Sequence, residues 1–288
     1  MTNGFSLIDL KGVSEPLSKL IDSVSKGIGG LYAPRGTVKA AKAEAEAMVI
    51  LAEAKEKVDS LTFRALERVT HQELRRQNNI DAIVEGAVGY LPDSVSSVEI
   101  DEDWIINFFN LGQDIGNPQM QKIWSKLLAG EVSHPGTFNS RTIQAVKSLS
   151  VDEANLFTVL CGFSFVVDGD WVLPVFSSGF FDYIRDNGLD TLDEVHLQNI
   201  GLLSGSPLWY GTNRDDGMIL VEYHSTPFLA FPEESGDDSG GDVEDVYIKA
   251  FPFTKTGMEL ARIAGGQPDS SYIDLLCDEK SILRVKQF

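Results

Sequence analysis

The chain has 288 residues, 43% of them hydrophobic, and a formal net charge of −19 at pH 7. This size and apolar content predict a folded, soluble protein of two or three domains. No run reaches the ~18 apolar residues of a membrane-spanning helix, and the first thirty residues lack the pattern of a secretory signal. Two cysteines, Cys161 and Cys277, are too few for a metal or disulfide framework, so we expect no cofactor and a cytoplasmic location.

The charge is distributed unevenly along the chain. Residues 1–43 contain six Lys or Arg and three Asp or Glu, a net charge of +3. Residues 151–288 contain eight Lys or Arg and 24 Asp or Glu, a net charge of −16. An acidic region of this strength repels phosphate backbones and keeps a protein soluble. The composition therefore argues against nucleic acid as a partner.

Residues 1–36 are expected to form an N-terminal amphipathic helix. Pro16 is compatible with a helix only near its start, which places the cap at Ser14. Apolar side chains follow at helical spacing, and five of them form a possible membrane or partner face: Leu17, Leu20, Ile21, Val24 and Ile28. Two interpretations remain open: this face packs on the long helix or on another subunit, or it lies on a membrane surface.

Residues 37–92 carry the longest helical pattern. No proline interrupts residues 37–91, and their Ala- and Glu-rich beginning consists of strong helix formers. The apolar positions recur at spacings of three, four and seven, and the candidate oligomerisation residues are Met48, Leu51, Val58, Leu61 and Ala65. A continuous helix of this span would be about 80 Å long, too long for one small core. We therefore expect it to pair as a coiled coil and make the protein an oligomer.

The second half of this long helix is dense in charge. Residues 64–79 contain Arg and Glu at close spacing, which predicts a solvated face with weak ion pairs. The pair Arg75-Arg76 could also contact a phosphate group.

Residues 93–162 are expected to form a helical domain. Cap-forming residues precede each apolar helical pattern: Asp101, Asn117 before Pro118, and Ser150 three positions before Glu153. A further helix begins near Ser140. The aromatic residues of this region are expected in the core, in preference to a ligand cage: Trp104, Phe108, Phe109 and Trp124.

Beyond Gly162 the pattern becomes rich in aromatic and β-branched residues. It predicts a hairpin over 163–176, with its turn at Asp168-Gly169-Asp170, and single strands over 218–231, 246–253 and 281–285. Helices are expected over 191–203 and after Thr254, and residues 233–245, with seven acidic side chains, form a loop. A helix ending in Gly201-Leu202-Leu203 before paired strands resembles a winged helix, although the acidic charge argues against reading DNA.

Residues 103–163 carry a specific signature. Asp103-Trp104 and Phe108-Phe109 precede the run MQKIWSKLLAGE at 120–131, the run PGTFNSRT at 135–142 and the group LCGF at 160–163. With the Ala- and Glu-rich helix, this pattern resembles a bacterial family known as domain of unknown function 2806, over most of the chain. That resemblance implies no activity. The Trp-rich helices also resemble abortive-infection alpha proteins, which implies a role in bacterial or prophage-borne defence against phage.

Three pairs of residues could carry chemistry: Glu131 with His134, Ser140 with Arg141, and Asp168 with Asp170. The first pair has metal-ligand spacing but no zinc-like cluster around it. The second lacks a nucleophile elbow, and a serine in this position suits a helix cap. The third flanks a glycine, as hairpin-turn residues do. The glycines of residues 27–30 lack the Lys-Ser/Thr of a phosphate-binding loop.

The sequence therefore predicts a mainly helical α+β protein in four parts. These are an amphipathic N-terminal helix (1–36), a long oligomerisation helix (37–92), a helical domain (93–162) and an acidic, winged-helix-like α+β domain (163–288). We expect a non-catalytic protein that oligomerises and presents its acidic domain to a protein partner. Two alternatives remain: a membrane-associated effector that acts on the bilayer at the inner membrane through its N-terminal helix, and an unrecognised hydrolase.

Overall fold

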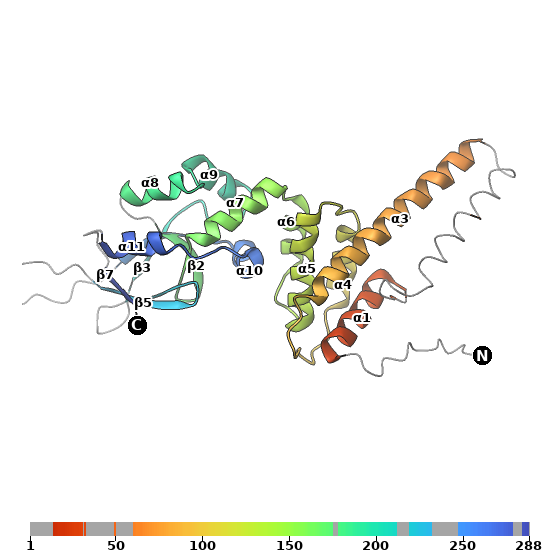
Figure 1. The fold of residues 1–288 in the computed structure, drawn as a ribbon, viewed down its shortest axis with the longest axis horizontal. Coiled ribbons are helices and arrows are strands. Elements are labelled where there is room, and N and C mark those ends of the chain that lie inside the picture. Colours follow the sequence, from red (N-terminus) through yellow and green to blue (C-terminus); the bar gives the residue numbers. More distant parts are fainter. Residues whose placement is uncertain are drawn as a thin grey trace, which may run out of the picture. The chain divides into compact units, whose positions relative to one another are not determined.

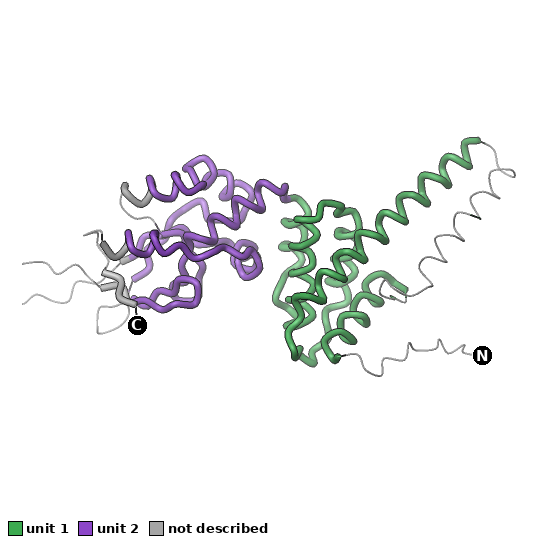
Figure 2. The backbone as a smooth tube through the Cα atoms, in the orientation of Figure 1, with its two compact units in different colours: residues 1–148 green, residues 149–288 purple. Residues whose placement is uncertain are grey.

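The computed structural model describes residues 14–30, 32, 49, 60–174, 178–211, 219–231, 247–278 and 284–287. The chain divides into two compact units, unit 1 (residues 1–148) and unit 2 (residues 149–288), shown in Figure 2. The described part of unit 1 is helical, and unit 2 combines helices with one antiparallel sheet (Figure 1). The fold is therefore of the α+β class, as the sequence predicted.

The described helices of unit 1 pack around a shared core. They are α1 (Glu15–Ile28), α3 (Ser60–Val88), α4 (Glu102–Gly112), α5 (Pro118–Ser133) and α6 (Ser140–Ser148). α5 packs along the C-terminal part of α3, and α1 packs on α4 and α5. The hydroxyl of Ser125 in α5 donates to the carbonyl oxygen of Ile83 at 2.8 Å, so the two helices approach closely enough for a direct bond.

The predicted helix caps of unit 1 are largely confirmed. The Asp101 carboxylate accepts from the Trp104 amide at 2.8 Å, and the Asn117 side chain accepts from the first turn of α5. Ser14 is the N-cap residue of α1, but its side chain makes no capping bond. One cap was assigned wrongly: the Asn139 side chain accepts from the Arg141 amide at 2.7 Å, so Ser140 begins α6 and does not cap it.

Aromatic side chains form the core of unit 1. Trp124 is fully buried, and its ring centroid lies 4.9 Å from that of Phe108, which stacks on Trp104. The Trp104 indole N–H donates to the carbonyl oxygen of Phe138 at 2.6 Å. These aromatic residues are therefore core residues, as expected, and the indole N–H of Trp104 is satisfied by the turn that follows α5.

Unit 2 contains a seven-stranded sheet in the order β3-β6-β2-β1-β4-β5-β7, and every paired neighbour is antiparallel. The strands are β1 (Phe165–Val167), β2 (Asp170–Pro174), β3 (Leu208–Gly211), β4 (Ile219–Tyr223), β5 (Thr226–Phe231), β6 (Tyr247–Pro252) and β7 (Arg284–Gln287). The helices are α7 (Val151–Gly162), α8 (Ser178–Asp186), α9 (Thr191–Asn199), α10 (Lys255–Ala264) and α11 (Ser270–Asp278).

The hairpin predicted at the start of unit 2 is present. β1 and β2 pair through Val167 and Asp170, and the turn between them has positive φ angles at Asp168 (51°) and Gly169 (87°). Asp and Gly tolerate this conformation, so the two aspartates are turn residues, as expected. The predicted capping box of α7 is also present, because the Ser150 and Glu153 side chains bond each other's backbone amides.

The single strand predicted over 218–231 is wrong. The structure has two strands, β4 and β5, joined by a turn at His224 and Ser225 with φ angles of 45° and 64°. Neither residue is a usual signal for a left-handed turn. The expected interruption of the strand at Pro227 lies close to the reversal, but Pro227 is within β5 and not in the turn. Three further elements, β3, α8 and α11, were not predicted either.

α7 belongs to unit 2, whereas the sequence grouped it with the helical domain 93–162. The rings of Phe157 in α7 and Phe253 have centroids 5.6 Å apart. At the end of α7, a side chain at Gly266 would lie 2.8 Å from the Cβ atom of Cys161. The apolar residues of α7 are therefore buried by the elements that follow them in the chain.

Candidate interaction surface

The N-terminal part of α3 stands out from unit 1 (Figure 1). None of the residues 60–78, which we call the arm, is buried. The next nine residues, 79–87, contain all the buried residues of α3: Asn79, Ile80, Asp81, Ile83, Val84 and Ala87. A helix of 29 residues is about 44 Å long, so well over half of it extends beyond the core.

Apolar side chains lie exposed along the arm. Leu61 is 69% exposed, Val69 is 50% exposed, and Ala65 between them is also exposed. Because successive residues of an α-helix turn by about 100°, these three lie within about 80° of one another. The same face carries Ile83 and Ala87 farther along the helix, where it is buried. The packed face of α3 thus continues into the arm as an exposed apolar stripe.

Two of the predicted oligomerisation residues, Leu61 and Ala65, therefore lie in this stripe. The other three, Met48, Leu51 and Val58, lie outside the described residues. Val69, four residues after Ala65, completes the stripe on the described part of the helix.

The predicted membrane or partner face lies on α1. Leu20 and Val24 are fully buried, whereas Leu17, Ile21 and Ile28 are half-buried. At Gly27 an added Cβ atom would lie 2.5 Å from the Phe109 ring, so α1 and α4 are in close contact. Membrane contact through Leu20 and Val24 would require α1 to leave unit 1. In the part of the chain that the structure describes, no helix is both long and apolar enough to cross a bilayer.

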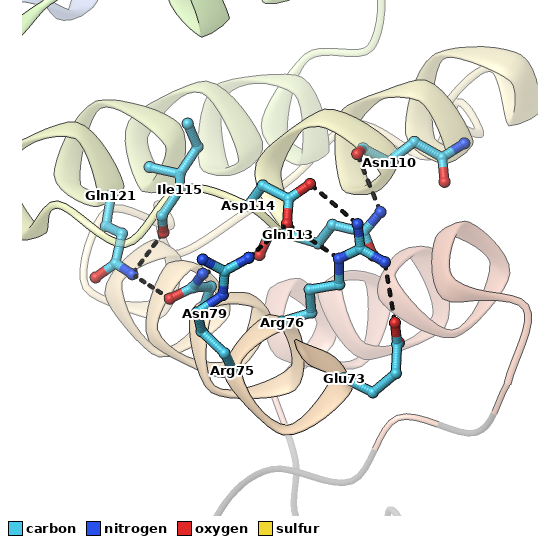
Figure 3. A network of polar contacts seen from close by, with 9 residues as sticks. All are labelled: Glu73, Arg75, Arg76, Asn79, Asn110, Gln113, Asp114, Ile115 and Gln121. Carbon is cyan, nitrogen blue, oxygen red and sulfur yellow. Dashed lines mark hydrogen bonds and ion pairs between the residues drawn. The ribbon is translucent and has the colours of Figure 1, made fainter. Parts of the chain in front are cut away.

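A polar network fixes α3 at the base of the arm (Figure 3). The Arg76 guanidinium donates to both carboxylate oxygens of Asp114, from Nε at 3.0 Å and from Nη2 at 3.3 Å. Its Nη1 atom donates to Glu73 at 2.9 Å, and Arg75 also reaches Asp114 at 3.3 Å. The bidentate bond to Arg76 lowers the pKa of Asp114, and the bond to Asp114 raises the pKa of Arg76.

Amide side chains extend this network toward the core. Asn79, which is buried, donates to the carbonyl oxygen of Gln113 at 2.9 Å. Gln121 donates to Asn79 at 3.3 Å and to the carbonyl oxygen of Ile115 at 2.8 Å (Figure 3). The network joins α3 to the connection between α4 and α5. Arg76 is therefore held by a carboxylate. The sequence analysis considered a phosphate group as the partner of Arg75-Arg76 and did not identify Asp114.

Glu131 and His134 serve different purposes in the structure. The Glu131 carboxylate is buried and accepts from the amides of Gly136 at 2.6 Å and Phe138 at 3.0 Å. His134 is exposed at the end of α5. Glu131 thus holds the turn after α5, as a buried carboxylate needs hydrogen-bond donors. Among the described residues there is no group of three or more His, Cys, Asp and Glu side chains suited to a metal ion.

A groove of about 340 Å³ lies between α1 and residues 96–100. The Lys19 amino group lies in it and donates to the carbonyl oxygen of Ser96 at 2.6 Å. Burial lowers the pKa of Lys19, and the carboxylates of Glu131 and Glu15 partly oppose this shift. Lys26 pairs with Glu99 at 3.1 Å along the same groove. Both lysines that line the groove thus already have a partner within the protein, Lys19 a carbonyl oxygen and Lys26 a carboxylate.

The sequence model of the family described as "Protein of unknown function (DUF2806)" matches residues 63–277, about three quarters of the chain. The match begins in the arm and ends in α11, so it includes parts of both units. No curated protein and no solved structure matches the chain.

Proposed function

Because the chain belongs to the family described as "Protein of unknown function (DUF2806)", as its signature predicted, and this description carries no activity, we propose a function from the residues of the chain itself. The protein is a non-catalytic interaction protein. It associates with a second copy through the arm of α3 and offers its acidic unit 2 to a protein partner.

The exposed apolar stripe of the arm carries this proposal. Leu61 and Val69 are 69% and 50% exposed on a face that is buried farther along the same helix. Full burial of a Leu or Val side chain stabilises a protein by roughly 1.5–3 kcal/mol, and most of the stability of a helix in a protein comes from packing of its apolar face. A second arm laid along the first would bury the stripe of both copies at once, as a two-fold symmetric interface does.

The partner of unit 2 is proposed from its charge. Unit 2 has eight Lys or Arg against 24 Asp or Glu, which favours a basic protein surface and disfavours nucleic acid. The winged-helix likeness of α9 and the strands after it stays part of this proposal, as a protein-binding module. Defence against phage is the proposed setting, on the likeness to abortive-infection alpha proteins alone.

Light scattering of the full chain tests the association. We expect a mass above that of one chain, and a lower mass for Leu61→Asp combined with Val69→Asp, because two buried charges would face the partner's apolar stripe. Leu51→Asp combined with Leu61→Asp should act in the same direction. The matched control is Glu67→Asp combined with His71→Asp, which alters exposed residues on the other side of the arm and should leave the mass unchanged. A wild-type chain that is monomeric at tens of micromolar contradicts the proposal.

A further inference from the structure

The arm carries a second stripe, which is basic. Arg64, Arg68 and Arg75 stand four and seven residues apart, so their side chains leave the helix within about 40° of one another. All three are exposed, and the Arg75 side chain is 62% exposed. The stripe extends over about 16 Å of helix and lies beside the apolar stripe, as the charged positions that flank a helix-pairing seam do.

These arginines are weakly neutralised. Arg64 donates to the carbonyl oxygen of Ser60 at 3.1 Å, which offers no charge. Within the described ranges no carboxylate forms an ion pair with Arg64 or Arg68. Arg75 shares Asp114 with Arg76, which holds both oxygens of that carboxylate. A protein of net charge −19 thus exposes a row of three arginines.

We propose that this basic stripe binds the acidic segment 233–245 of a second copy of the chain. The segment has seven Asp or Glu and no Lys or Arg in 13 residues. An extended chain of that length spans up to about 45 Å, more than the stripe needs. The inference rests on the proposed association, which brings a second copy to the arm. It adds a charge contact between the arm of one copy and unit 2 of the other.

Nucleic acid is the other polyanion to consider, and the charges disfavour it. Three arginines neutralise about three phosphates, whereas proteins with strong backbone binding make about 6–10 such contacts. Unit 2, with a net charge of −16, would repel the phosphates. Unit 2 repels the acidic segment of a second copy as well, so the preference for that segment rests on the small extent of the stripe and on the positive charge of the arm, which has four arginines and two glutamates in residues 60–78.

The first experiment measures the contact directly. The seven acids of 233–245 are replaced by Asn and Gln in the full chain, and a fluorescent peptide of residues 233–245 is titrated against this variant by anisotropy. We expect binding that weakens at high salt and weakens further, by at least about tenfold, when Arg64→Gln, Arg68→Gln and Arg75→Gln are added. The control replaces three exposed basic residues elsewhere, Lys122, Arg141 and Arg262, by Gln and should leave binding unchanged.

Two outcomes overturn the inference at this stage. One is a peptide affinity that is the same with and without the three arginines. The other is an oligonucleotide, single-stranded or duplex, that binds the arginine stripe more tightly than the peptide does.

The second experiment tests whether the contact joins two copies. The variant without the acids keeps the arginines, and the variant without the arginines keeps the acids, so only a mixture can form the contact between chains. We expect each tagged variant to capture the other more strongly than it captures itself, and the excess to disappear at high salt. Equal capture overturns the inference. Loss of all capture together with a monomeric wild-type mass refutes the proposed association instead, so the two failures are distinguishable.

Discussion

Single residues decide the packing of unit 1 by filling space and by satisfying buried polar groups. Trp124 is fully buried against Phe108 and against Gly112, where an added Cβ atom would lie 3.0 Å from the indole. Glu131 is 1% exposed and accepts from two amides of the turn after α5. Substitution of either residue should lower the stability of unit 1. The neighbours of Trp124 cannot fill the space that its indole leaves, and the two amides would lose the carboxylate that accepts their hydrogen bonds.

Trp124→Ala should therefore unfold unit 1. We do not expect it to leave the fold intact and remove only a binding function. Truncation of a buried tryptophan costs about 3–5 kcal/mol, which is a large part of the stability of a typical domain. Thermal unfolding followed by circular dichroism is the measurement. Trp209→Ala in unit 2 is the control, because Trp209 is 66% exposed. A melting temperature that Trp124→Ala leaves unchanged would show that the tryptophan is not a core residue.

At the scale of elements, α3 packs against the rest of unit 1 only near its C-terminal end. Arg76, Asp114 and Asn79 connect it to the turn between α4 and α5, and the part of the arm N-terminal to Glu73 extends beyond that network (Figures 1 and 3). The network sets the direction in which the arm leaves unit 1. Loss of its ion pairs should therefore affect both the stability of unit 1 and the geometry of association.

The Asp114–Arg76 pair predicts a dependence of stability on pH. The pKa of Asp114 is lowered in the folded protein, so the carboxylate stabilises the fold at pH values above its unfolded pKa near 4. This contribution is lost as the pH falls through the lower, folded pKa. We expect the free energy of unfolding in urea to fall in this acidic range for the wild type. The fall should be smaller for Asp114→Asn. The exposed Asp93 provides the control Asp93→Asn, and identical pH profiles for Asp114→Asn and the wild type would contradict the assignment.

The burial of α1 leads to a prediction about membranes. Leu20 and Val24 are fully buried, so the full chain should remain in solution when it is floated with anionic liposomes at low salt. The opposite result would be that the wild type floats with the liposomes and that Val24→Asp combined with Ile28→Asp does not. It would show that α1 leaves unit 1 and anchors the protein. That result would favour the membrane effector over the interaction protein.

At the scale of the whole molecule, the two units differ in charge and in secondary structure. Unit 1 has a net charge of −3 from 16 basic and 19 acidic residues, whereas unit 2 has a net charge of −16. Unit 1 exposes its apolar and arginine stripes on the arm, and unit 2 holds most of the excess acid. This separation favours association between unlike surfaces of two copies, which is what the capture experiment measures.

The sequence by itself determined the features that depend on neighbouring residues. The caps at Asp101, Asn117, Ser150 and Thr254, the turn at Asp168-Gly169, and the family signature at residues 103–163 all follow from short-range patterns. A cap or a tight turn needs only a side chain and amides within three residues, so its sequence pattern is legible without the fold.

Only the tertiary structure decided what those elements bury and which distant residues meet. Asp114 lies 38 residues from Arg76. Glu131, considered as a metal ligand from its spacing to His134, instead accepts from the amides of Gly136 and Phe138. The hairpin of β4 and β5 turns at His224 and Ser225, which are held there by strand pairing. The amphipathic pattern of α1 fitted a membrane face as well as a core face, since both bury apolar side chains. Contact with α4 and α5 made Leu20 and Val24 core residues, while the same kind of pattern on the arm stayed exposed.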